Sequence, residues 1–386
     1  MDRQDRGRWP VAAMFLANGF VMGSWAPQIP LLLPRFNITE GALGLLILIL
    51  GLGAVAAMAG SGQIIARLGS KGTLSVFAPL AALALAGVVV APTLALLALA
   101  MAFMGAVIGC MDVAMNANAV EVERRMGRAI MSSSHGFWSL GGFAGGMSGG
   151  LLIAALGPTG HALLASALAL GLVLAALPYL LATPPAPGAE ERRAGGRWPK
   201  GIAIYLLGVM ALFSMVPEGA VLDWAALYLG QELGTGLAAS GLAFGAFSGA
   251  MAVMRFAGDG IRNRFGAVVV LRVSALIAAM GMLAASLAPG GAWAIAAFAL
   301  AGLGIANTVP VVISAAGNHG GGSGASSGSA IALVTMMGYS GILVAPSLIG
   351  WVAEAVGFRW TFGALAGLLL VVVAQAGRVA AADRAG

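Results

Sequence analysis

The residues of this sequence that could do acid–base chemistry lie inside long apolar runs, and two of them are in VPEGAVLDWAALY, residues 216–228. An ionised carboxylate is costly in lipid, so such residues are functional candidates. Glu218 follows Pro217, which removes a backbone hydrogen bond and kinks a helix. Asp223 is five positions further on, about 140° around a helix, so the two acids do not share a face. We predict that Glu218 takes up a proton; for Asp223, proton coupling and structural hydrogen bonding both stay open.

A second group of polar residues lies in the run at 93–120 and at the start of the next run. Asp112 and Asn116 are four positions apart, on one stripe of a helix. His135 is about two turns into the following run and is expected at similar depth. Asp112 and His135 could pair, each stabilising the charged form of the other, or His135 could be a packing residue. Both residues are therefore candidates for proton coupling.

Neutral polar and aromatic side chains at membrane depth are candidates for contact with a solute. Amides hydrogen-bond hydroxyl groups, and aromatic rings stack on the apolar face of a sugar-like ring. The predicted substrate-binding residues are Asn18, Trp25, Gln28, Asn116, Trp138, Trp224, Asn307 and Tyr339. Tryptophans near the ends of the runs, such as Trp351 and Trp360, are instead expected at the membrane–water interface.

The composition of the chain is that of a helical membrane protein. Of its 386 residues 60% are hydrophobic and 9% charged, with mean hydropathy +0.96, whereas ordinary domains carry about 25% charged residues. The apolar runs are continuous rather than alternating, which favours helices over a β-barrel. We predict twelve transmembrane helices at about 9–34, 40–67, 72–92, 93–120, 128–156, 159–182, 199–229, 236–262, 266–288, 290–316, 326–356 and 358–380.

The positions of the cations predict the topology. Lysines and arginines gather before the first run, in every second connection and at the end of the chain, whereas the alternate connections hold only Arg35 and Arg359. This is the positive-inside pattern with both termini cytoplasmic. The basic pI near 10.2 is thus a topology signal, and no nucleic-acid partner is expected. The single cysteine, Cys110, excludes an intramolecular disulfide.

Two short sequences recur about half a chain apart. GRWP occurs at residues 7–10 and 196–199, and ARLGSK at 66–71 is echoed by NRFGAV at 263–268. A segment rich in Pro, Gly and charge, ATPPAPGAEERRAGG, lies between the copies. We predict a six-helix half at 1–182, a cytoplasmic linker at 183–198 and a second six-helix half at 199–386. Transporters built from such repeats bind their solute near the midplane, between the halves.

The whole chain resembles the major facilitator superfamily. GQIIARLGSKG from Gly62 is similar to the signature of the family between helices 2 and 3, with Ala66 at the position where Asp is usual. DVAMNANAVEVE, SSSHGFWSLGGFAGG and GYSGILVAPSLIGWVAE resemble a bacterial branch that includes MosC-type and YbjJ-type permeases and, more distantly, the fucose permease. The resemblance implies a gating role for Arg67, Gly69, Lys71 and Arg264. Arg255 and Asp259, at i and i+4, could also act in gating by holding helix ends together in the outward-facing state, or they could only neutralise charge at a membrane edge.

The predicted function is secondary transport by alternating access in a bacterial inner membrane, driven by protons, of a small sugar- or polyol-like solute. Proton-driven efflux of a drug-like or metabolic compound is the alternative; the run at 128–156 lacks the proline of the antiporter signature of the family, which argues against it. A non-transporting sensor and a membrane-embedded enzyme are further alternatives. No P-loop or metal motif occurs. We therefore expect that the protein is not an enzyme and that it binds no cofactor and no metal. We expect a monomer whose partners are the solute, protons and the lipid bilayer.

Overall fold

The computed structural model describes residues 7–126, 130–182, 201–319 and 327–383. Within these ranges the regular structure is helical, with no strand. The helices are α1 (Arg8–Trp25), η2 (Ala26–Gln28), α2 (Ile29–Phe36), α3 (Glu40–Val90), α4 (Leu94–Met126), α5 (Met131–Ala176), η3 (Leu177–Tyr179), α6 (Ile202–Gln231), η5 (Leu237–Ala239), α7 (Leu242–Phe265), α8 (Ala267–Ser286), α9 (Gly291–Ile305), α10 (Thr308–His319), α11 (Ser327–Val356), α12 (Phe358–Gln375) and η7 (Ala376–Asp383).

The helices confirm the predicted membrane-spanning architecture. In the described part of the chain, nine helical stretches are long and apolar enough to cross a membrane. Two of them, α3 with 51 residues and α5 with 46, are each interrupted by a glycine with non-helical dihedral angles. Because about 20 residues cross a bilayer, each of these two crosses it twice. The stretch from α1 to α2 is the remaining span, broken by the 3₁₀ turn η2.

Four glycines reverse the chain at equivalent places in the two halves. Gly69 has φ 72° and ψ 167°, and Gly266 has φ 76° and ψ 159°. Gly157 (φ 73°, ψ 168°) and Gly357 (φ 88°, ψ 162°) repeat this geometry at the other end of the bundle. Residues with a Cβ rarely adopt it. Gly69 and Gly266 are the glycines of the ARLGSK and NRFGAV echo, so this repeat in the sequence is a repeat in backbone conformation. The second GRWP copy and the linker at 183–198 lie outside the described residues.

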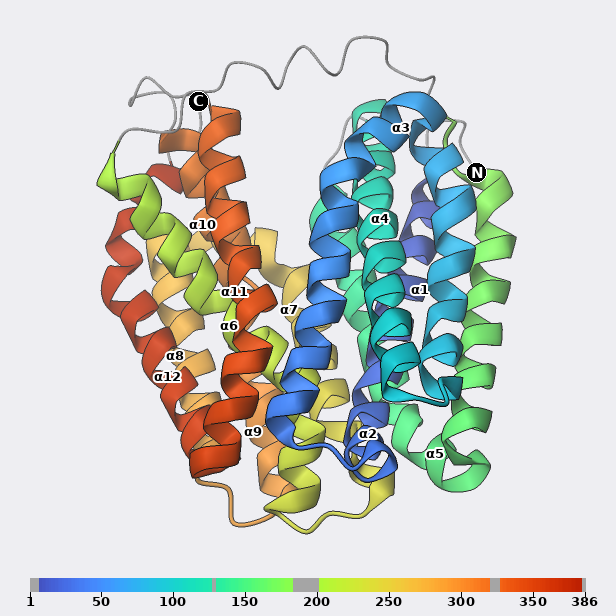
Figure 1. Ribbon diagram of the computed structural model, residues 1–386. Helices are drawn as coiled ribbons and strands as arrows, with labels where there is room; N and C mark the ends of the chain where they lie inside the picture. The colour runs from blue at the N-terminus through green and yellow to red at the C-terminus, as the bar shows by residue number, and fades with distance from the viewer. Residues whose placement is uncertain (1–6, 127–129, 183–200, 320–326, 384–386) are drawn as a thin grey trace.

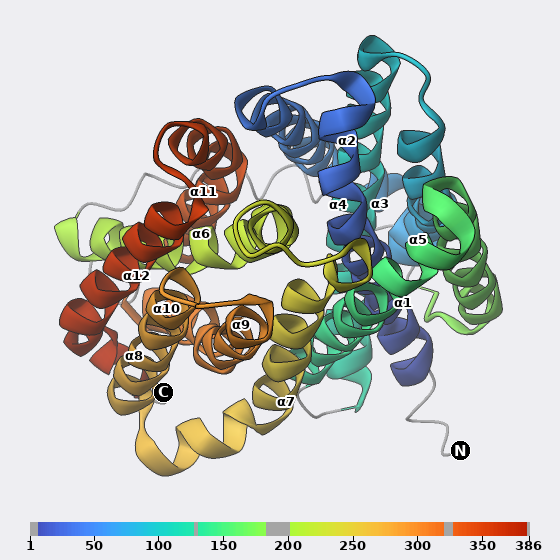
Figure 2. The same ribbon diagram turned by 90° about the horizontal axis from the view of Figure 1, so that it is seen from below.

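The helices form two bundles side by side, α1 to η3 in one and α6 to η7 in the other (Figure 1). We call them the N half and the C half. The beginning of α1 and the end of η7 lie at the same end of the molecule, here named the terminal face (Figure 1). The opposite end, the distal face, holds the turns at Gly157 and Gly357. Seen from the distal side, the two bundles meet along α5, α7, α3 and α11 (Figure 2).

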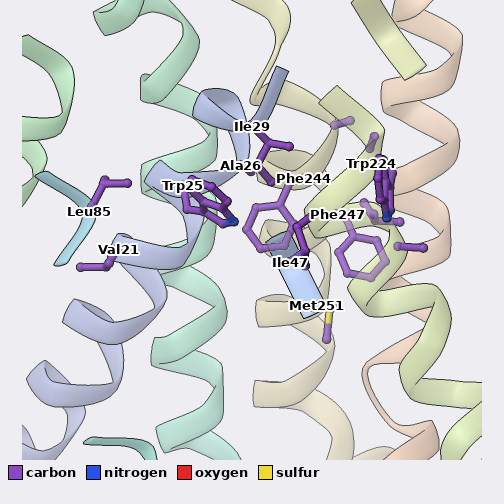
Figure 3. Packing of buried hydrophobic residues seen from close by; sticks show 14 of the residues in the cluster. Val21, Trp25, Ala26, Ile29, Ile47, Leu85, Trp224, Phe244, Phe247 and Met251 are labelled. Carbon is purple, nitrogen blue, oxygen red and sulfur yellow. The ribbon is translucent and has the colours of Figure 1, made fainter. Parts of the chain in front are cut away.

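The two halves share a hydrophobic core. One buried cluster contains residues of both halves, including Trp25 of α1, Phe244 and Phe247 of α7 and Trp224 of α6 (Figure 3). A second cluster contains only C-half residues, such as Leu207, Val312 and Val379. Leu207 lies in the first turns of α6 and Val379 in η7, so this second cluster lies toward the terminal face. The shared core therefore does not extend through the whole height of the molecule.

The polar contacts between α3 and α11 close the distal face. The Glu354 carboxylate accepts a hydrogen bond from the backbone N–H of Gly41 at 3.0 Å, and the Ser347 hydroxyl donates to the Gly44 carbonyl at 3.0 Å. We name residues 40–44 of α3 together with residues 346–354 of α11 the distal clasp. The Gln231 amide of α6 also donates to Glu40 at 2.8 Å. Each contact joins the two halves, which brings them together at this face.

Candidate functional site

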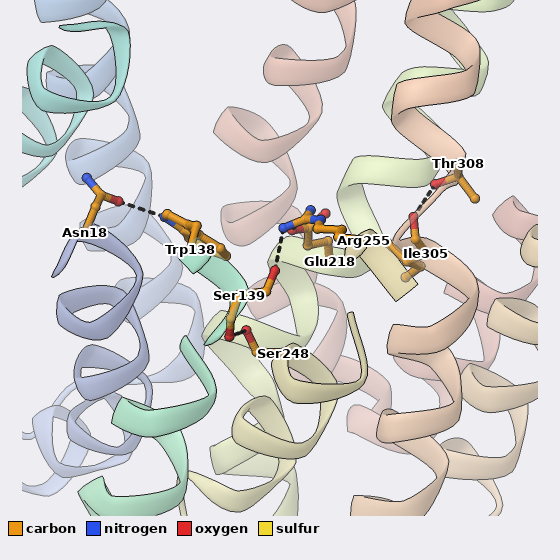
Figure 4. A network of polar contacts seen from close by, with 8 residues as sticks. All are labelled: Asn18, Trp138, Ser139, Glu218, Ser248, Arg255, Ile305 and Thr308. Atoms are coloured by element: carbon orange, nitrogen blue, oxygen red, sulfur yellow. Dashed lines mark hydrogen bonds and ion pairs between the residues drawn. The ribbon is translucent and has the colours of Figure 1, made fainter. Parts of the chain in front are cut away.

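An arginine of the C half lies at the centre of the contact between the halves (Figure 4). The Arg255 guanidinium on α7 donates through Nη1 to the Ser139 hydroxyl on α5 at 2.6 Å. Its Nη2 forms an ion pair with Glu218 Oε1 on α6 at 3.4 Å. The two side chains are only 15% and 23% exposed. One cation therefore joins an acid of its own half to a hydroxyl of the other half.

The backbone around Ser139 fixes this arrangement. The Ser248 hydroxyl on α7 donates to the Ser139 carbonyl at 2.8 Å. Gly142, about one turn along α5, is so close to Ser248 that an added Cβ would lie 2.4 Å from the Ser248 hydroxyl oxygen. The absence of a side chain on Gly142 thus lets α7 approach α5. We call Arg255, Glu218, Ser139 and Ser248 the Arg255 network.

Tyr339 on α11 lies within electrostatic range of this network and of the predicted acid on α4. Its side chain interacts electrostatically with Asp112, Glu218 and Arg255, so residues of α4, α6, α7 and α11 converge on one region. The Asn116 amide donates to the Asp112 carbonyl at 2.9 Å and to the Asp112 carboxylate at 3.4 Å. Two predicted proton-coupling acids, Glu218 and Asp112, and two predicted substrate-binding residues, Asn116 and Tyr339, are thus brought together.

His135 and Asp223 differ from these two acids. The His135 ring packs edge-on against Phe15 with ring centroids 5.1 Å apart, and it is within electrostatic range of Arg255. Over the described ranges, no hydrogen bond or ion pair joins His135 to Asp112. Asp223 is 6% exposed, and no hydrogen bond or ion pair to it occurs among the described residues.

The remaining predicted substrate-binding residues fall into two environments. The Trp138 indole donates to the Asn18 side-chain carbonyl at 2.8 Å, joining α5 to α1 (Figure 4). The Gln28 amide donates to the Pro158 carbonyl at 2.9 Å and contacts His161 Nδ1 at 2.8 Å. Both contacts are internal to the N half. Gln28 is buried within that half, and its amide is occupied by protein groups.

Trp25 and Trp224 are fully buried in the shared core, and Trp224 packs against Phe358 at 5.8 Å between ring centroids. Asn307 lies in the break between α9 and α10 and is 7% exposed. An added Cβ on Gly258 of α7 would lie 2.4 Å from Asn307 Oδ1. Asn307 Nδ2 has no hydrogen-bond partner among the residues that the structure describes. The Asn307 amide thus packs on α7, one turn from Arg255.

The predicted gating residues are spread over the terminal face and the centre. Gly69 forms the reversal described above, and Lys71 Nζ donates to the Pro178 carbonyl at 2.8 Å. Arg67 is exposed, and the Arg264 guanidinium is 5.3 Å from the Phe265 ring. Arg255 lies in the Arg255 network, and its predicted gating role with Asp259 stays a prediction. The side chain of Asp259 lies outside the described part of the chain.

Comparison with known proteins assigns the family. The sequence model of the protein family described as Major Facilitator Superfamily matches residues 11–329. The chain belongs to the major facilitator superfamily. It is 34% identical over 365 residues to the uncharacterised transporter y4wD of Sinorhizobium fredii, covering 94% of this chain and 95% of that protein. It is 32% identical over 351 residues to the membrane protein MosC of Rhizobium meliloti, covering 90% and 84%. The predicted family and branch are confirmed.

Solved transporters share the fold. The structure of a mutant of the nucleoside transporter NupG aligns with a TM-score of 0.76 at 14% identity, covering 96% of this chain and 99% of that one. A D-xylose–proton symporter aligns with a TM-score of 0.74 at 16% identity, covering 94% and 95%. As a member of the superfamily, this protein is a multi-pass membrane transporter of a small molecule and not an enzyme. The fold supports this assignment, and the solute is a separate question.

Ser139 and Ser248 of the Arg255 network were not among the predicted site residues. Both are small residues in helices rich in glycine, where a serine reads as a packing residue. The available signal was the position of Ser139 in the glycine-rich helix that also carries His135 and Trp138. No group of three His, Cys, Asp or Glu side chains that could hold a metal occurs among the described residues.

Proposed function

We propose that this protein is a proton-coupled secondary transporter that takes up a small hydroxylated solute by alternating access. The observation that carries the proposal is the ion pair between Glu218 and Arg255, which lies between the halves and contacts Ser139 across their interface. A proton on Glu218 would break its ion pair with the largely buried Arg255 guanidinium. Because breaking a buried ion pair costs several kcal/mol, protonation changes the relative stability of the states that Arg255 bridges.

The basic clusters support an orientation for this cycle. Arg67, Lys71, Arg124 and Arg264 gather at the terminal face, which the positive-inside rule assigns to the cytoplasm. The distal clasp then closes the periplasmic side in this structure. Uptake requires that the clasp opens when the halves rock, within a protein that works as a monomer in the bacterial inner membrane, with both termini cytoplasmic.

The solute site that we propose lies at the Arg255 network, where α4, α6, α7 and α11 converge. Asp112, Asn116, Tyr339 and Asn307 surround it with carboxylate, amide and hydroxyl groups, which suit a solute with several hydroxyl groups. The similarity in fold to a D-xylose–proton symporter and to a nucleoside transporter is in keeping with such a solute. Glu218 is the first candidate for the proton site, and Asp112, Asp223 and His135 are further candidates.

A binding panel followed by transport tests this function. Thermal unfolding of purified protein is measured with sugars, inositols, amino acids and lipophilic cations at pH 5.5 and 7.5, since a ligand of the folded state raises Tm. We expect shifts with hydroxylated solutes that grow at the lower pH, and a loss of this pH dependence in Glu218→Gln. Shifts with lipophilic cations alone would overturn uptake and favour efflux.

Transport of a solute from that panel in proteoliposomes then tests the coupling. An external medium more acidic than the lumen should drive accumulation in the native protein. Glu218→Gln should lose at least about tenfold of this accumulation and keep counterflow, which needs no net proton movement. Glu121→Gln is the matched control, because Glu121 pairs with the exposed Arg124 at 3.9 Å and with no other cation in the described part of the chain. Native accumulation by Glu218→Gln would refute the role of this acid.

A further inference from the structure

We propose that the contact between α5 and α7 stays closed through the transport cycle, so that the halves swing about it and only the α3–α11 side opens on the periplasmic face. We call the line of contacts between residues 136–150 of α5 and the residues of η5 and α7 that face them the seam. Symmetric rocking would instead part both sides of the interface together. The inference goes beyond the proposed function, because it concerns how the halves move and holds for any solute.

The seam runs through a large part of the membrane. At its distal end, an added Cβ on Gly150 would lie 2.4 Å from the Ala238 carbonyl oxygen. At its other end, a Cβ on Gly136 would lie 2.7 Å from Phe256 Cζ, and the Phe256 ring meets Phe137 edge-on at 5.6 Å between centroids. Gly136 and Gly150 are 14 positions apart, which is about 21 Å along a helix. The hydrocarbon core is about 30 Å thick, so the halves touch over most of that depth on this side.

Between its two ends, the seam is buried and is joined through the backbone. The Ser248 hydroxyl donates to the Ser139 carbonyl, and both residues are 0% exposed. A Cβ added to Gly146 would lie 2.7 Å from the Gly245 backbone nitrogen, so the two helix backbones touch with no side chain between them. Parting the helices here would leave the buried Ser248 hydroxyl without its acceptor, which is costly.

The contacts on the α3–α11 side are distributed differently. Among the described residues, the hydrogen bonds between these two helices lie in the distal clasp, where Glu354 accepts from Gly41 and Ser347 donates to Gly44. Figure 1 shows α3 and α11 close together at the distal face and diverging toward the terminal face. The clasp lies at the end of the bundle, so water can take over its hydrogen bonds when the helices part. This side therefore opens at a lower cost than the seam.

The two sides of the interface together have the geometry of a hinge. Seen from the distal side, the α3–α11 contact and the α5–α7 contact lie on opposite sides of the interface (Figure 2). A rotation about a line displaces most the points that are farthest from it. Rotation about the seam therefore moves the clasp most, while Ser139 and Ser248 keep their contact. The periplasmic side then opens between α3 and α11, into the interior of the interface.

A glycine substitution on the seam tests the proposal in the full chain. Gly146→Ala overpacks the seam, and Gly171→Ala in the same helix is the matched control, since nothing lies within 4 Å of its added Cβ. The reporter is Ser347→Cys in a Cys110→Ala background, labelled with a membrane-impermeant maleimide from the periplasmic side. We expect Gly146→Ala to lower Tm by a few degrees. Its labelling rate should stay within about twofold of the control, because a contact present in every state changes no ratio of states.

Distances between spin labels provide a second measurement in the same Cys110→Ala background. The labelled positions are exposed in this structure, and the pairs are Leu45 with Leu348 across α3 and α11, and Leu151 with Leu237 across the seam. Gly44→Ala, which overpacks the clasp, is compared with Gly60→Ala, which meets no atom within 4 Å. We expect Gly44→Ala to widen the distance across α3 and α11 by several ångströms and to leave the distance across the seam unchanged.

The other outcomes overturn the proposal. A labelling rate in Gly146→Ala that differs from the control by more than about twofold would show that the seam takes part in opening, as would a wider distance across the seam in Gly44→Ala. An unchanged Tm in Gly146→Ala would remove the tight contact on which the hinge depends.

Two provisions keep the test decisive. If Gly146→Ala does not fold, Gly249→Ala takes its place, because the atoms nearest to its added Cβ belong to the Phe143 ring, which can move. If Gly44→Ala changes neither distance, the labelling of Ser347→Cys in the seam variant decides alone.

Discussion

The distal clasp predicts that a single methyl group on Gly44 opens the periplasmic side. A Cβ added to Gly44 of α3 would lie 2.9 Å from the Pro346 carbonyl oxygen and 2.9 Å from the Ser347 Cα. Ordinary contacts between non-bonded heavy atoms are about 3.5–4.0 Å. Both neighbours are backbone atoms of α11, so no side-chain rotation relieves the overlap. Gly44→Ala therefore pushes α11 away from α3.

The size of the effect follows from where the overlap occurs. Inserting a methyl group into a tight contact costs about 1–3 kcal/mol. The cost falls only on the state in which α3 and α11 touch, because these helices belong to different halves. The ratio of the closed to the open distal side should then fall by roughly 5- to 150-fold. Gly60→Ala in the same helix is the matched control, since nothing lies within 4 Å of its added Cβ.

Cysteine labelling measures this ratio away from the mutated helix. In a Cys110→Ala background, Ser240→Cys places a thiol at the distal start of α7, at a position only 6% exposed. A membrane-impermeant maleimide added from the periplasmic side should label it several-fold faster in Gly44→Ala than in Gly60→Ala. Equal labelling of the two variants, or slower labelling of Gly44→Ala, would refute the assignment of the clasp as the periplasmic closure.

Two further substitutions test single contacts. Gly258→Ala should displace the Asn307 amide, whose Oδ1 would be 2.4 Å from the new Cβ, and should raise the KM for transport by about tenfold. Gly260→Ala, whose added Cβ meets no atom within 4 Å, should leave KM unchanged. Equal KM values for the two variants would contradict a role for Asn307. Trp138→Phe should lower stability by about 1–3 kcal/mol, seen as a lower Tm, because the Asn18 carbonyl is left buried without its donor. Adding Asn18→Leu should restore part of that loss, and an unchanged Tm in Trp138→Phe would show that the bond contributes nothing.

The helices and their reversals could be predicted from the sequence because each has a local physical cause. An apolar run of about 20 residues predicts one crossing of the bilayer. The two predicted spans within α3 and the two within α5 follow from this rule, although each helix continues across the turn between its two spans. Gly69 and Gly266 were identified through a repeated sequence, and their positive φ values explain why glycine occurs at both places. These features depend on a few neighbouring residues, so a single sequence is enough to predict them.

The partners of the polar residues could not be predicted because they depend on how each helix is rotated. A helix surrounded by lipid and by other helices is apolar on all sides, so its hydrophobic pattern does not identify the face that meets a neighbour. Asn18 and Trp138 are both predicted to bind the solute, and the hydrogen bond between them could not be predicted from their positions in the sequence. The contacts of Arg255 with Glu218 and Ser139 arise because α6 and α5 approach α7, which no pattern along its own helix could indicate.

Glu218 and Asp223, five positions apart on α6, differ in the property that proton coupling requires. A coupling group needs each of its protonation states to be favoured in some state of the cycle. Glu218 meets this condition through its ion pair with Arg255, because Arg255 belongs to another helix and can move relative to Glu218 when the halves rearrange. Asp223 is buried among described residues that give it no cation and no hydrogen-bond donor. The mobile counter-ion, rather than the depth of the carboxylate in the membrane, therefore makes Glu218 the stronger candidate for proton coupling.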